Sequence, residues 1–580
     1  MATPFYDKFP TIRIPGETGG AAVTGWAAAA AAVGDALDRA GAGAVVTVEL
    51  YPGARRDEIV AGLGFRDVEV LDPGAAMRAP GDMATMLSRF LTEDRVFGYL
   101  APFHMAEFFD VGRLAALRQQ VEALRATGRP VAIVGTGAAL VHPGDVLVYA
   151  DMPRWEIQRR MRAGMANWTA DNPNEDFLLK YKRAFFVEWR TADRHKAGLF
   201  DRVDLFLDTT EAGAPRLVRG TAMRKALAGL VHRPFRVVPF FDPGVWGGQW
   251  MRERFDLDDD APNYAWGFDC VPEENSLRLA FGDVVTEVPA KNLVMRHPEE
   301  LLGPRVHARF GPEFPIRFDF LDTMGGGNLS LQVHPDVGYI HDTFGMAYTQ
   351  DESYYILDAG DDASVYLGFR TGATLSDFAA AIEAAQAGGP PPDIERHANR
   401  FPARRHDHFS IPAGTLHCSG KDCVVLEISA TPFIFTFKLW DWGRVGLDGR
   451  PRPVHLEHGQ RVLRPDRDTA WVEANLIGQV EPLARGDGWR EERTGLHGLE
   501  FIETRRHWFT APVDHFTDGS VHVLNLIEGT RAIVESPDGA FEPFPVSYAE
   551  TFIVPAAVGA YRVRPDGPGE HATIRASIRI

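Results

Sequence analysis

The sequence predicts a multidomain protein that combines α/β and all-β structure. We expect an N-terminal doubly wound α/β domain, followed by an all-β, jelly-roll module with a small helical insertion. Short apolar runs alternate with helical patterns up to about residue 230. From about residue 235 onward, Gly, Pro and aromatic residues separate short strands. A faint internal repeat in this second half favours two barrels.

The α/β prediction rests on apolar runs of strand length, at 44–50, 95–101, 130–136, 146–150 and 202–208. Residues 113–128 lie between two of these runs, carry apolar side chains at helical spacing and end in Gly128. Short apolar strands that alternate with helices are typical of a mostly parallel sheet. We therefore expect the α/β domain to cover residues 1–232.

The second half predicts antiparallel strands at 363–370, 408–414 and 423–429, each bounded by turn residues. A helical insertion is expected near 374–389, because a helical pattern there stops at two glycines followed by three prolines. Strands with turns on both sides form a sandwich or barrel, so the insertion interrupts a barrel domain.

Two segments of the second half share a pattern of strand, Pro-Ala, small residue and strand. They are FSIPAGTLH (409–417) and FIVPAAVGAY (552–561). The second copy has Tyr561 where the first has a histidine. We therefore expect barrel domains at 233–456 and 457–580, of which only the first binds a metal.

Composition and charge narrow the functional classes. The 580 residues include 61 Lys and Arg against 79 Asp and Glu, a net charge of −18. This balance argues against nucleic-acid binding, because phosphate contacts need clustered basic side chains. Three cysteines are too few for a disulfide framework. The start of the chain shows no secretory signal, and the alanine run at 27–32 is only weakly apolar. We therefore expect a cytoplasmic protein without a membrane segment.

Four side chains of the first barrel form a candidate metal site. Gln332 and His334 lie at i and i+2 in NLSLQVHPD, so a strand would place both on one face. Glu352 follows at the entrance to the next strand, and His417 ends the IPAGTLH segment. Two imidazole nitrogens, a carboxylate oxygen and an amide oxygen suit one Zn²⁺ ion or another first-row divalent ion.

Each of these residues also has a simpler interpretation. A histidine that is hydrogen-bonded inside a barrel accounts for His334 or His417, and Glu352 alone is compatible with a solvent-facing position. Only their placement on successive strands favours a metal. Cys418 and Cys423 fit no CxxC spacing, so we expect them to pack in the core.

Several segments of the second half resemble the type I phosphomannose isomerases (mannose-6-phosphate isomerases), which are metal-dependent cupin enzymes. They include PGVWGGQWMRERF (243–255), FPIRFDFLD (314–322), NLSLQVHPD (328–336), FSIPAGTLH (409–417) and DWGRVGLDGRPRPVHLE (441–457), in family order. The resemblance covers about residues 235–580 and implies a double cupin. It also implies one zinc ion, bound by Gln332, His334, Glu352 and His417.

The sequence departs from the family at three basic positions. Gln350 stands two residues before the metal-binding glutamate, where the family has a lysine. Asp319 replaces another lysine, and Lys438 stands where the family has an arginine. The matched motifs leave Lys438 as the candidate catalytic residue, for holding phosphate or stabilising an oxyanion. Arg444 is the candidate for substrate binding, with structural pairing to Asp441 as its alternative.

The resemblance implies an aldose–ketose isomerase that interconverts mannose 6-phosphate and fructose 6-phosphate, or a closely related sugar phosphate. Two alternatives stay open. One is a non-catalytic sugar-binding or regulatory protein. The other is an isomerase of an unphosphorylated sugar, which the loss of basic residues favours.

The N-terminal half faintly resembles a degenerate small P-loop kinase. TVELYPGARRDEIV (47–60) has the place of a phosphate-binding loop but lacks GxxxxGK[ST]. VGTGAAL (134–140) is too short for a dinucleotide fingerprint. Residues 148–162 resemble an Arg-bearing lid, whose arginines we expect on a solvated helix face. The sequence therefore predicts no phosphotransfer by this half.

Overall fold

The chain divides into two compact units that exchange segments. The computed structural model describes residues 6–16, 20–65, 68–447, 449, 452–495, 497–498 and 500–579. One unit, here called the α/β unit, comprises Thr11–Gly229 and Ser276–Arg296. The described residues before Thr11, together with Leu230–Asn275 and the chain after Arg296, form the two-barrel unit. The chain therefore passes between the units at four points, after Pro10, Gly229, Asn275 and Arg296.

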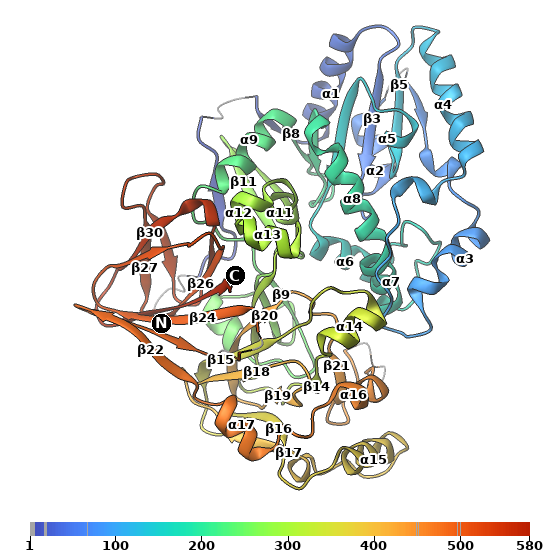
Figure 1. The fold of residues 1–580 in the computed structure, drawn as a ribbon. Helices are drawn as coiled ribbons and strands as arrows, with labels where there is room; N and C mark the ends of the chain where they lie inside the picture. The colour runs from blue at the N-terminus through green and yellow to red at the C-terminus, as the bar shows by residue number, and fades with distance from the viewer. Residues whose placement is uncertain are drawn as a thin grey trace. The chain divides into compact units, whose positions relative to one another are not determined.

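The α/β unit contains a seven-stranded sheet in the order β2-β8-β7-β6-β3-β5-β4 (Figure 1). Its strands are β2 (Ala22–Thr24), β3 (Val45–Leu50), β4 (Glu69–Leu71), β5 (Val131–Gly135), β6 (Val146–Asp151), β7 (Leu205–Asp208) and β8 (Arg216–Arg219). Strands β3 to β7 pair in parallel, and β8 and β2 add antiparallel strands at one edge. The strands predicted at 44–50, 130–136, 146–150 and 202–208 are confirmed.

The strand predicted at 95–101 is wrong. The backbone of this segment bonds to helical neighbours instead: Tyr99 N–H donates to Phe90 O, and Ala101 N–H donates to Phe186 O. Phe90 lies in helix α3 and Phe186 in the π-helical segment Ala184–Glu188, so the segment meets no strand edge. Its apolar residues reflect burial rather than strand pairing.

Helices flank the main sheet of the α/β unit. They are α1 (Trp26–Ala40), α2 (Arg56–Leu63), α3 (Pro80–Leu91), α4 (Val111–Arg125), α5 (Ala138–Val141), α6 (Arg154–Arg162), α7 (Phe177–Arg183), α8 (Trp189–Leu199) and α9 (Gly220–Leu230). Crossovers from β3 to β4 and from β5 to β6 run in opposite directions along the sheet. Because such crossovers are right-handed, the sheet is covered on both faces, and Figure 1 shows α1 and α4 on either side of β3 and β5, as expected for a doubly wound sheet.

Residues 276–296 belong to the α/β unit although they follow the first strands of the other unit. They form β11 (Ser276–Phe281), β12 (Val284–Pro289) and α11 (Lys291–Arg296), and β11 pairs in parallel with β1 (Thr11–Arg13). Glu287 N–H donates to Asp208 Oδ2 at 2.8 Å, and Asn292 Nδ2 donates to Asp151 Oδ2 at 3.0 Å. The segment therefore covers the carboxyl ends of β6 and β7.

The first barrel consists of two antiparallel sheets, in the orders β18-β15-β20-β13-β10-β9 and β17-β16-β19-β14-β21. Its strands are β9 (Phe240–Asp242), β10 (Trp266–Cys270), β13 (Ile316–Asp322), β14 (Leu331–Val333), β15 (Glu352–Ala359), β16 (Ser364–Phe369), β17 (Ala398–Pro402), β18 (His408–Ile411), β19 (His417–Ser419), β20 (Cys423–Ala430) and β21 (Phe437–Trp440). The strands predicted at 363–370, 408–414 and 423–429 correspond to β16, β18 and β20 and are confirmed.

Short helices accompany the first barrel. They are α10 (Trp250–Phe255), α12 (Pro298–Leu302), α13 (Pro304–Phe310), α14 (Val337–Phe344), α15 (Leu375–Gln386), α16 (Leu456–Val462) and α17 (Thr469–Asn475). Helix α15 confirms the insertion predicted near 374–389. Arg467, between α16 and α17, donates to Pro412 O and Ala413 O at 2.8 Å each. The chain after residue 456 therefore still packs against the first barrel.

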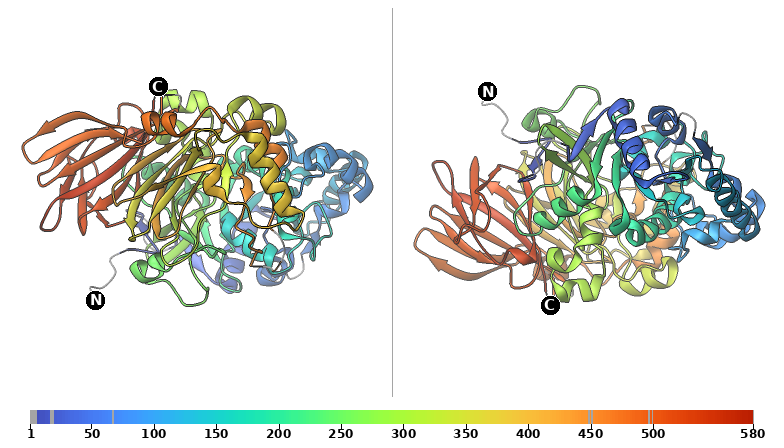
Figure 2. Two further views of the ribbon diagram at one scale, coloured as in Figure 1. Left: turned by 90° about the horizontal axis from the view of Figure 1, so that it is seen from below. Right: turned by 90° about the horizontal axis from the view of Figure 1, so that it is seen from above.

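The second barrel repeats the strand order of the first. Its strands are β22 (Val480–Gly486), β23 (Trp489–Thr494), β24 (Ile502–Phe509), β25 (Val513–Phe516), β26 (His522–Glu528), β27 (Arg531–Glu535), β28 (Phe544–Ser547), β29 (Thr551–Val554), β30 (Ala560–Pro565) and β31 (His571–Ile578). Both views in Figure 2 show them as one group in orange and red. The orders β29-β26-β31-β24 and β28-β27-β30-β25 match β18-β15-β20-β13 and β17-β16-β19-β14. This correspondence confirms the internal repeat.

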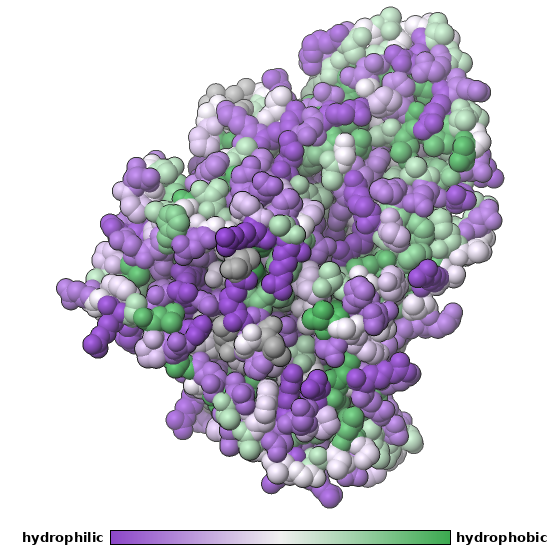
Figure 3. Space-filling view, in the orientation of Figure 1, coloured by the Kyte–Doolittle hydropathy of each residue, from purple (hydrophilic) through white to green (hydrophobic). Residues whose placement is uncertain are grey.

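The first described residues are anchored in the two-barrel unit. Asp7 N–H donates to Glu550 Oε1 at 2.7 Å, and the Arg236 guanidinium lies 4.8 Å from the centre of the Tyr6 ring. On the face shown in Figure 3, hydrophilic side chains predominate and apolar ones are interspersed among them. Within the described part of the chain, no helix is both long and apolar enough to cross a membrane.

Candidate metal centre

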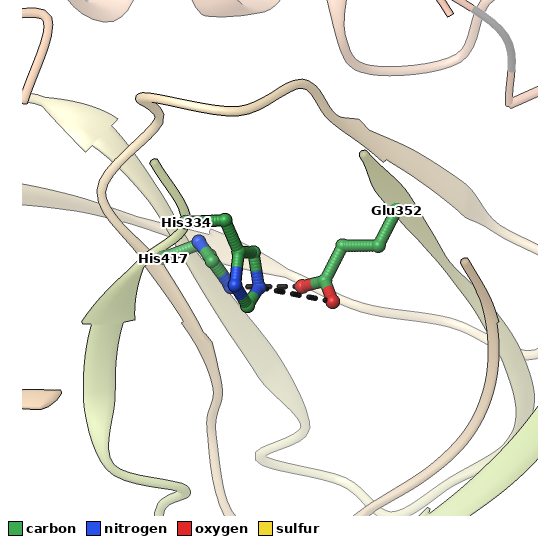
Figure 4. A group of neighbouring side chains, drawn as sticks. All are labelled: His334, Glu352 and His417. Atoms are coloured by element: carbon green, nitrogen blue, oxygen red, sulfur yellow. Dashed lines mark ion pairs between the residues drawn. The ribbon is translucent and has the colours of Figure 1, made fainter. Parts of the chain in front are cut away.

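The structure brings the four predicted metal-binding side chains together inside the first barrel. Gln332 on β14 and His417 on β19 are register partners in one sheet. His334 follows β14 directly, so strand alternation gives it the same direction as Gln332. Glu352 opens β15 in the other sheet, and its carboxylate points at both imidazoles (Figure 4). The two sheets thus place these groups face to face.

Three members of this group, Glu352 and the two imidazoles, are in direct contact. Glu352 Oε2 is 3.1 Å from His334 Nε2, and Glu352 Oε1 is 2.8 Å from His417 Nε2. One ligand atom from each of the three residues lies within 4.8 Å of the others. Burial by itself would raise the pKa of Glu352, but the two imidazoles outweigh burial and lower it well below its usual range. Glu352 is therefore an ionised, fully enclosed carboxylate.

The second nitrogen of each imidazole is oriented by a backbone carbonyl. His417 Nδ1 lies 2.8 Å from Thr415 O, and His334 Nδ1 lies 3.4 Å from Phe435 O. An imidazole that donates through Nδ1 presents the Nε2 lone pair to its other side, as metal-binding histidines do. Neither His334 Nε2 nor Glu352 Oε1 has a well-oriented hydrogen-bond partner among the described residues. Converging lone pairs of this kind are satisfied by a cation, so the residues fit a divalent ion.

Gln332 completes the predicted set. Its Nε2 atom lies 3.3 Å from His417 Nε2, and the side chain is 7% exposed. The oxygen and nitrogen of the amide exchange places by a half-turn about the last side-chain bond. The carbonyl oxygen can therefore take the inward position and supply the fourth ligand.

Lys438 lies beside this group on a neighbouring strand. It is the register partner of Gln332 across β14 and β21, so both side chains leave the sheet on the same face. Lys438 is half-buried and makes no side-chain hydrogen bond or ion pair with any described residue. Burial and the nearby Arg452 lower the pKa of Lys438 to about 7, with Asp441 opposing and Arg444 adding to the shift. A half-buried ammonium without a paired carboxylate among the described residues suits contact with an anion.

Arg444 is engaged within its own segment. Its NH2 atom donates to Asp441 Oδ1 at 2.6 Å, and Arg452 Nε lies 2.7 Å from Asp441 Oδ2. The structural pairing considered for Arg444 is therefore present, and a contact with substrate would compete with it. Residues 448, 450 and 451 of the matched DWGR segment lie outside the described residues.

A second set of polar and charged residues lies behind Glu352, and sequence analysis identified its members Gln350 and Asp319 but missed Arg317 and Glu427. Arg317 on β13 contacts Asp319 and Glu427, and Gln350 connects Glu427 to Glu352. The available signal was the i, i+2 spacing of Arg317 and Asp319 in FPIRFDFLD, which gives both residues one strand face. The reversed charge at Asp319 is thus accompanied by a cation two residues earlier.

The second barrel has different side chains at the corresponding positions. Glu352 and His522 both open a strand, and both pair with the residue that precedes the Pro-Ala turn of their barrel. His522 therefore takes the place of Glu352. Tyr561 on β30 takes the place of His417 on β19, as the sequence repeat predicts.

The substituted side chains of the second barrel contact one another. Tyr561 Oη lies 2.8 Å from His522 Nδ1, and the rings of His515 and Tyr561 stack 4.9 Å apart. Arg575 has the register position of Glu427, since each pairs with the second residue after His522 or Glu352. A guanidinium at this position repels a cation.

We predict that the second barrel binds no metal and that the whole chain binds one divalent ion. His515→Ala and His522→Ala should leave the zinc content of the purified protein at one equivalent, because neither residue belongs to the candidate metal centre of the first barrel. The zinc content per chain is measured by elemental analysis of both variants and of the wild type. A second equivalent of zinc that disappears in either variant would contradict this expectation.

The loop after β3 in the α/β unit lines a cavity of about 570 Å³ at the carboxyl end of the sheet. The cavity is bounded by the β3–α2 loop, by Gly135 at the end of β5 and Thr136 after it, and by Trp168. The loop offers Ala54, Arg55 and Arg56, with no lysine or hydroxyl in P-loop spacing.

The turn after β5 is occupied by a carboxylate of the chain itself. Glu49 Oε1 accepts from Gly137 N–H at 2.6 Å, and Glu49 Oε2 accepts from Ala139 N–H at 2.8 Å. The N–H groups that would meet a dinucleotide phosphate are therefore already bonded.

We accordingly predict that the chain neither hydrolyses ATP nor transfers its phosphate. The measurement is magnesium-dependent release of phosphate from ATP by the full-length protein, with Arg56→Ala as a matched variant. Turnover by the wild type that falls in this variant would refute the prediction.

The arginines of α6 were predicted to lie on a solvated helix face, but two of them are buried. Arg154 and Arg160 are 7% and 3% exposed, and they pair with Asp193 and Glu156 at 2.7 Å each. Only Arg159 and Arg162 are exposed as expected. The prediction was therefore wrong for two of the four, because buried carboxylates from α8 and α6 compensate their charge.

Comparison with known proteins finds a family model for the N-terminal part of the chain and relatives named mannose-6-phosphate isomerase. Residues 25–232 match a family described as "Domain of unknown function (DUF8485)". The Bacillus subtilis protein named "Probable mannose-6-phosphate isomerase GmuF" is 28% identical over 254 residues, which cover 43% of this chain and 74% of that relative. Mannose-6-phosphate isomerase of Streptococcus mutans is 27% identical over 234 residues, covering 39% and 68%. The crystal structure of mannose 6-phosphate isomerase from Bacillus subtilis aligns with a TM-score of 0.48 and 20% identity, covering 60% of this chain and 99% of that one. The chain is thus similar in sequence to proteins named mannose-6-phosphate isomerase.

Proposed function

We propose that the chain is a metal-dependent aldose–ketose isomerase that interconverts mannose 6-phosphate and fructose 6-phosphate. One Zn²⁺ ion, or another first-row divalent ion, would be held by Gln332, His334, Glu352 and His417. The observation that carries the proposal is the buried convergence of two imidazole Nε2 atoms on the Glu352 carboxylate. The names of the sequence relatives support the reaction class.

The residues of the site would have two separate roles in this reaction: some would bind the ion, and Lys438 would contact the substrate. A divalent ion bound here would polarise the sugar carbonyl and acidify the adjacent C–H group. The ionised Glu352 and the two imidazoles, all buried, would hold that ion in place. Lys438, whose pKa of about 7 keeps it partly protonated at neutral pH, neutralises the substrate phosphate or the oxyanion that develops.

The proposal is tested by assaying the purified chain on mannose 6-phosphate before and after chelation. We expect isomerisation that chelation abolishes and zinc restores. A zinc-loaded protein that isomerises neither mannose 6-phosphate nor free mannose would instead favour the non-catalytic sugar-binding alternative. Calorimetric titration with both sugars then detects binding without turnover.

A second candidate function is isomerisation of an unphosphorylated sugar. The observation that favours it is the absence of lysine at Gln350 and Asp319, both of which are buried beside Glu352. Activity on free mannose that exceeds activity on mannose 6-phosphate would establish this alternative. We also propose a reducing, cytoplasmic location, because Cys270, Cys418 and Cys423 are buried and form no disulfide.

A further inference from the structure

We propose that Gln350 is a positioning residue for the metal-binding carboxylate and that Arg317 sets its orientation through Glu427. This inference rests on the proposed metal centre and extends it to residues that do not touch the ion. It assigns a role to the position where the resembling family has a lysine. Here the positive charge lies instead on Arg317 of β13, a strand that is separated from β15 by β20.

Gln350 is fixed by two carboxylates. Its Nε2 atom donates to Glu352 Oε2 at 3.1 Å and to Glu427 Oε1 at 3.2 Å. Because the ionised Glu352 carboxylate can only accept hydrogen bonds, the nitrogen end of the amide must face it, so the direction of the side chain is determined. Gln350 is 2% exposed, and water therefore does not compete for these bonds.

Glu427 is held in turn by Arg317. The NH1 atom of Arg317 donates to Glu427 Oε1 at 3.0 Å, and its NH2 atom donates to Asp319 Oδ2 at 2.9 Å. Ser429 Oγ adds a third bond to Glu427 Oε1, at 2.9 Å. The planar guanidinium spans two carboxylates at once, which the single ammonium of a lysine cannot do in the same geometry.

The chain of contacts ends on the Glu352 carboxylate. Glu352 Oε2 receives the Gln350 bond and also lies 3.1 Å from His334 Nε2. The second oxygen, Oε1, has no well-oriented hydrogen-bond partner among the described residues and faces His417. Gln350 thus fixes the rotation of the carboxylate and leaves one oxygen available. Partners of this kind typically change metal affinity by about 10- to 100-fold when they are removed.

The test is the dissociation constant for zinc, measured on full-length protein by competition with a chelating indicator. Gln350→Met keeps the length of the side chain and removes its donor, so we expect the constant to rise about 10- to 100-fold. Arg317→Lys should also raise the zinc dissociation constant. The double variant should match Gln350→Met alone, because Arg317 acts through Gln350.

Arg506→Lys is the matched control. Arg506 is a buried arginine of the same unit, 8% exposed, and it bonds to Glu492 at 2.6 Å rather than to the Glu352 group. Its replacement should leave the zinc constant unchanged. Melting temperatures of the metal-free proteins separate the roles. A merely structural residue would lower the melting temperature without changing the zinc constant.

Each outcome decides the question. A zinc constant of Gln350→Met equal to that of the wild type overturns the inference while leaving the metal centre intact. A wild type that binds no zinc overturns the metal centre, and the inference with it. If Arg317→Lys does not fold, Gln350→Met alone decides, since it removes a single neutral amide.

Discussion

Replacement of His334 or His417 by alanine is expected to remove the metal and to lower isomerase activity by about 1000-fold or more. In the proposed site each imidazole would contribute a principal ligand, and its Nε2 atom already points at Glu352. Metal-ion polarisation of a carbonyl is worth several kcal/mol, and a loss of about 4 kcal/mol corresponds to about 1000-fold in rate. The measurements are elemental analysis and steady-state kinetics on mannose 6-phosphate.

Thermal unfolding adds a measurement that does not depend on activity. An ion that binds only the folded protein raises the melting temperature, so zinc should stabilise the wild type and fail to stabilise either histidine variant. His522→Ala, in the second barrel, is the matched control and should respond to zinc like the wild type. Undiminished metal in both His334→Ala and His417→Ala would remove these residues from the site.

Lys438→Ala is expected to lower kcat/KM on mannose 6-phosphate by about 30- to 1000-fold. Loss of a charge-assisted contact to an anion in an enclosed site costs about 2–4 kcal/mol. Lys438 is the residue to test because its ammonium meets no described partner, whereas Arg444 bonds to Asp441. On free mannose the loss should be much smaller, unless Lys438 acts on the oxyanion itself. Equal rates for wild type and Lys438→Ala on both sugars would exclude the residue from the mechanism.

The pH dependence of this contact has a definite sign. The pKa of Lys438 is lowered to about 7, so the side chain is charged below that pH and loses its proton as the pH rises through it. We therefore expect kcat/KM on the phosphorylated substrate to fall above about pH 7. Lys438→Arg should retain activity and remove this fall, because a guanidinium stays charged throughout the range. A fall that persists unchanged in Lys438→Arg would assign it to another group.

Local patterns predicted much of the fold, because each reflects a contact between neighbouring residues. The run at 44–50 is a fully buried strand, and the glycine pair at Gly388 ends a helix as expected. The run at 95–101 failed because its backbone bonds to the end of the preceding helix α3 and to the distant π-helical segment at Phe186, and not to a strand. The exchange of residues 276–296 was equally hidden, since it depends on Asp208 and Asp151, which no nearby pattern links to that segment.

In the candidate site, too, sequence patterns predicted the local features but not the contacts between residues that are distant in sequence. Strand alternation placed Gln332 and His334 on one face, and the structure brings Glu352 and His417 to the same point. The orientation of the imidazoles by Thr415 O and Phe435 O involves backbone atoms and leaves no mark in side-chain types. The contacts of Arg317 join residues more than 100 positions apart, such as Glu427, and a single sequence does not reveal such pairs.

The four passages of the chain between the units also govern the order in which the newly made protein can fold. Domains generally fold as they leave the ribosome, beginning with the N-terminal one. Here Thr11 pairs with Arg278, and Asn292 bonds to Asp151, so the first unit is incomplete until these later residues have emerged. The hydrogen bond from Asp7 to Glu550 can form only after almost the whole chain has been synthesised. The α/β unit can therefore close only after Arg296 has been made, and the two-barrel unit only near the end of synthesis. A gene cut near codon 230 would yield two incomplete products.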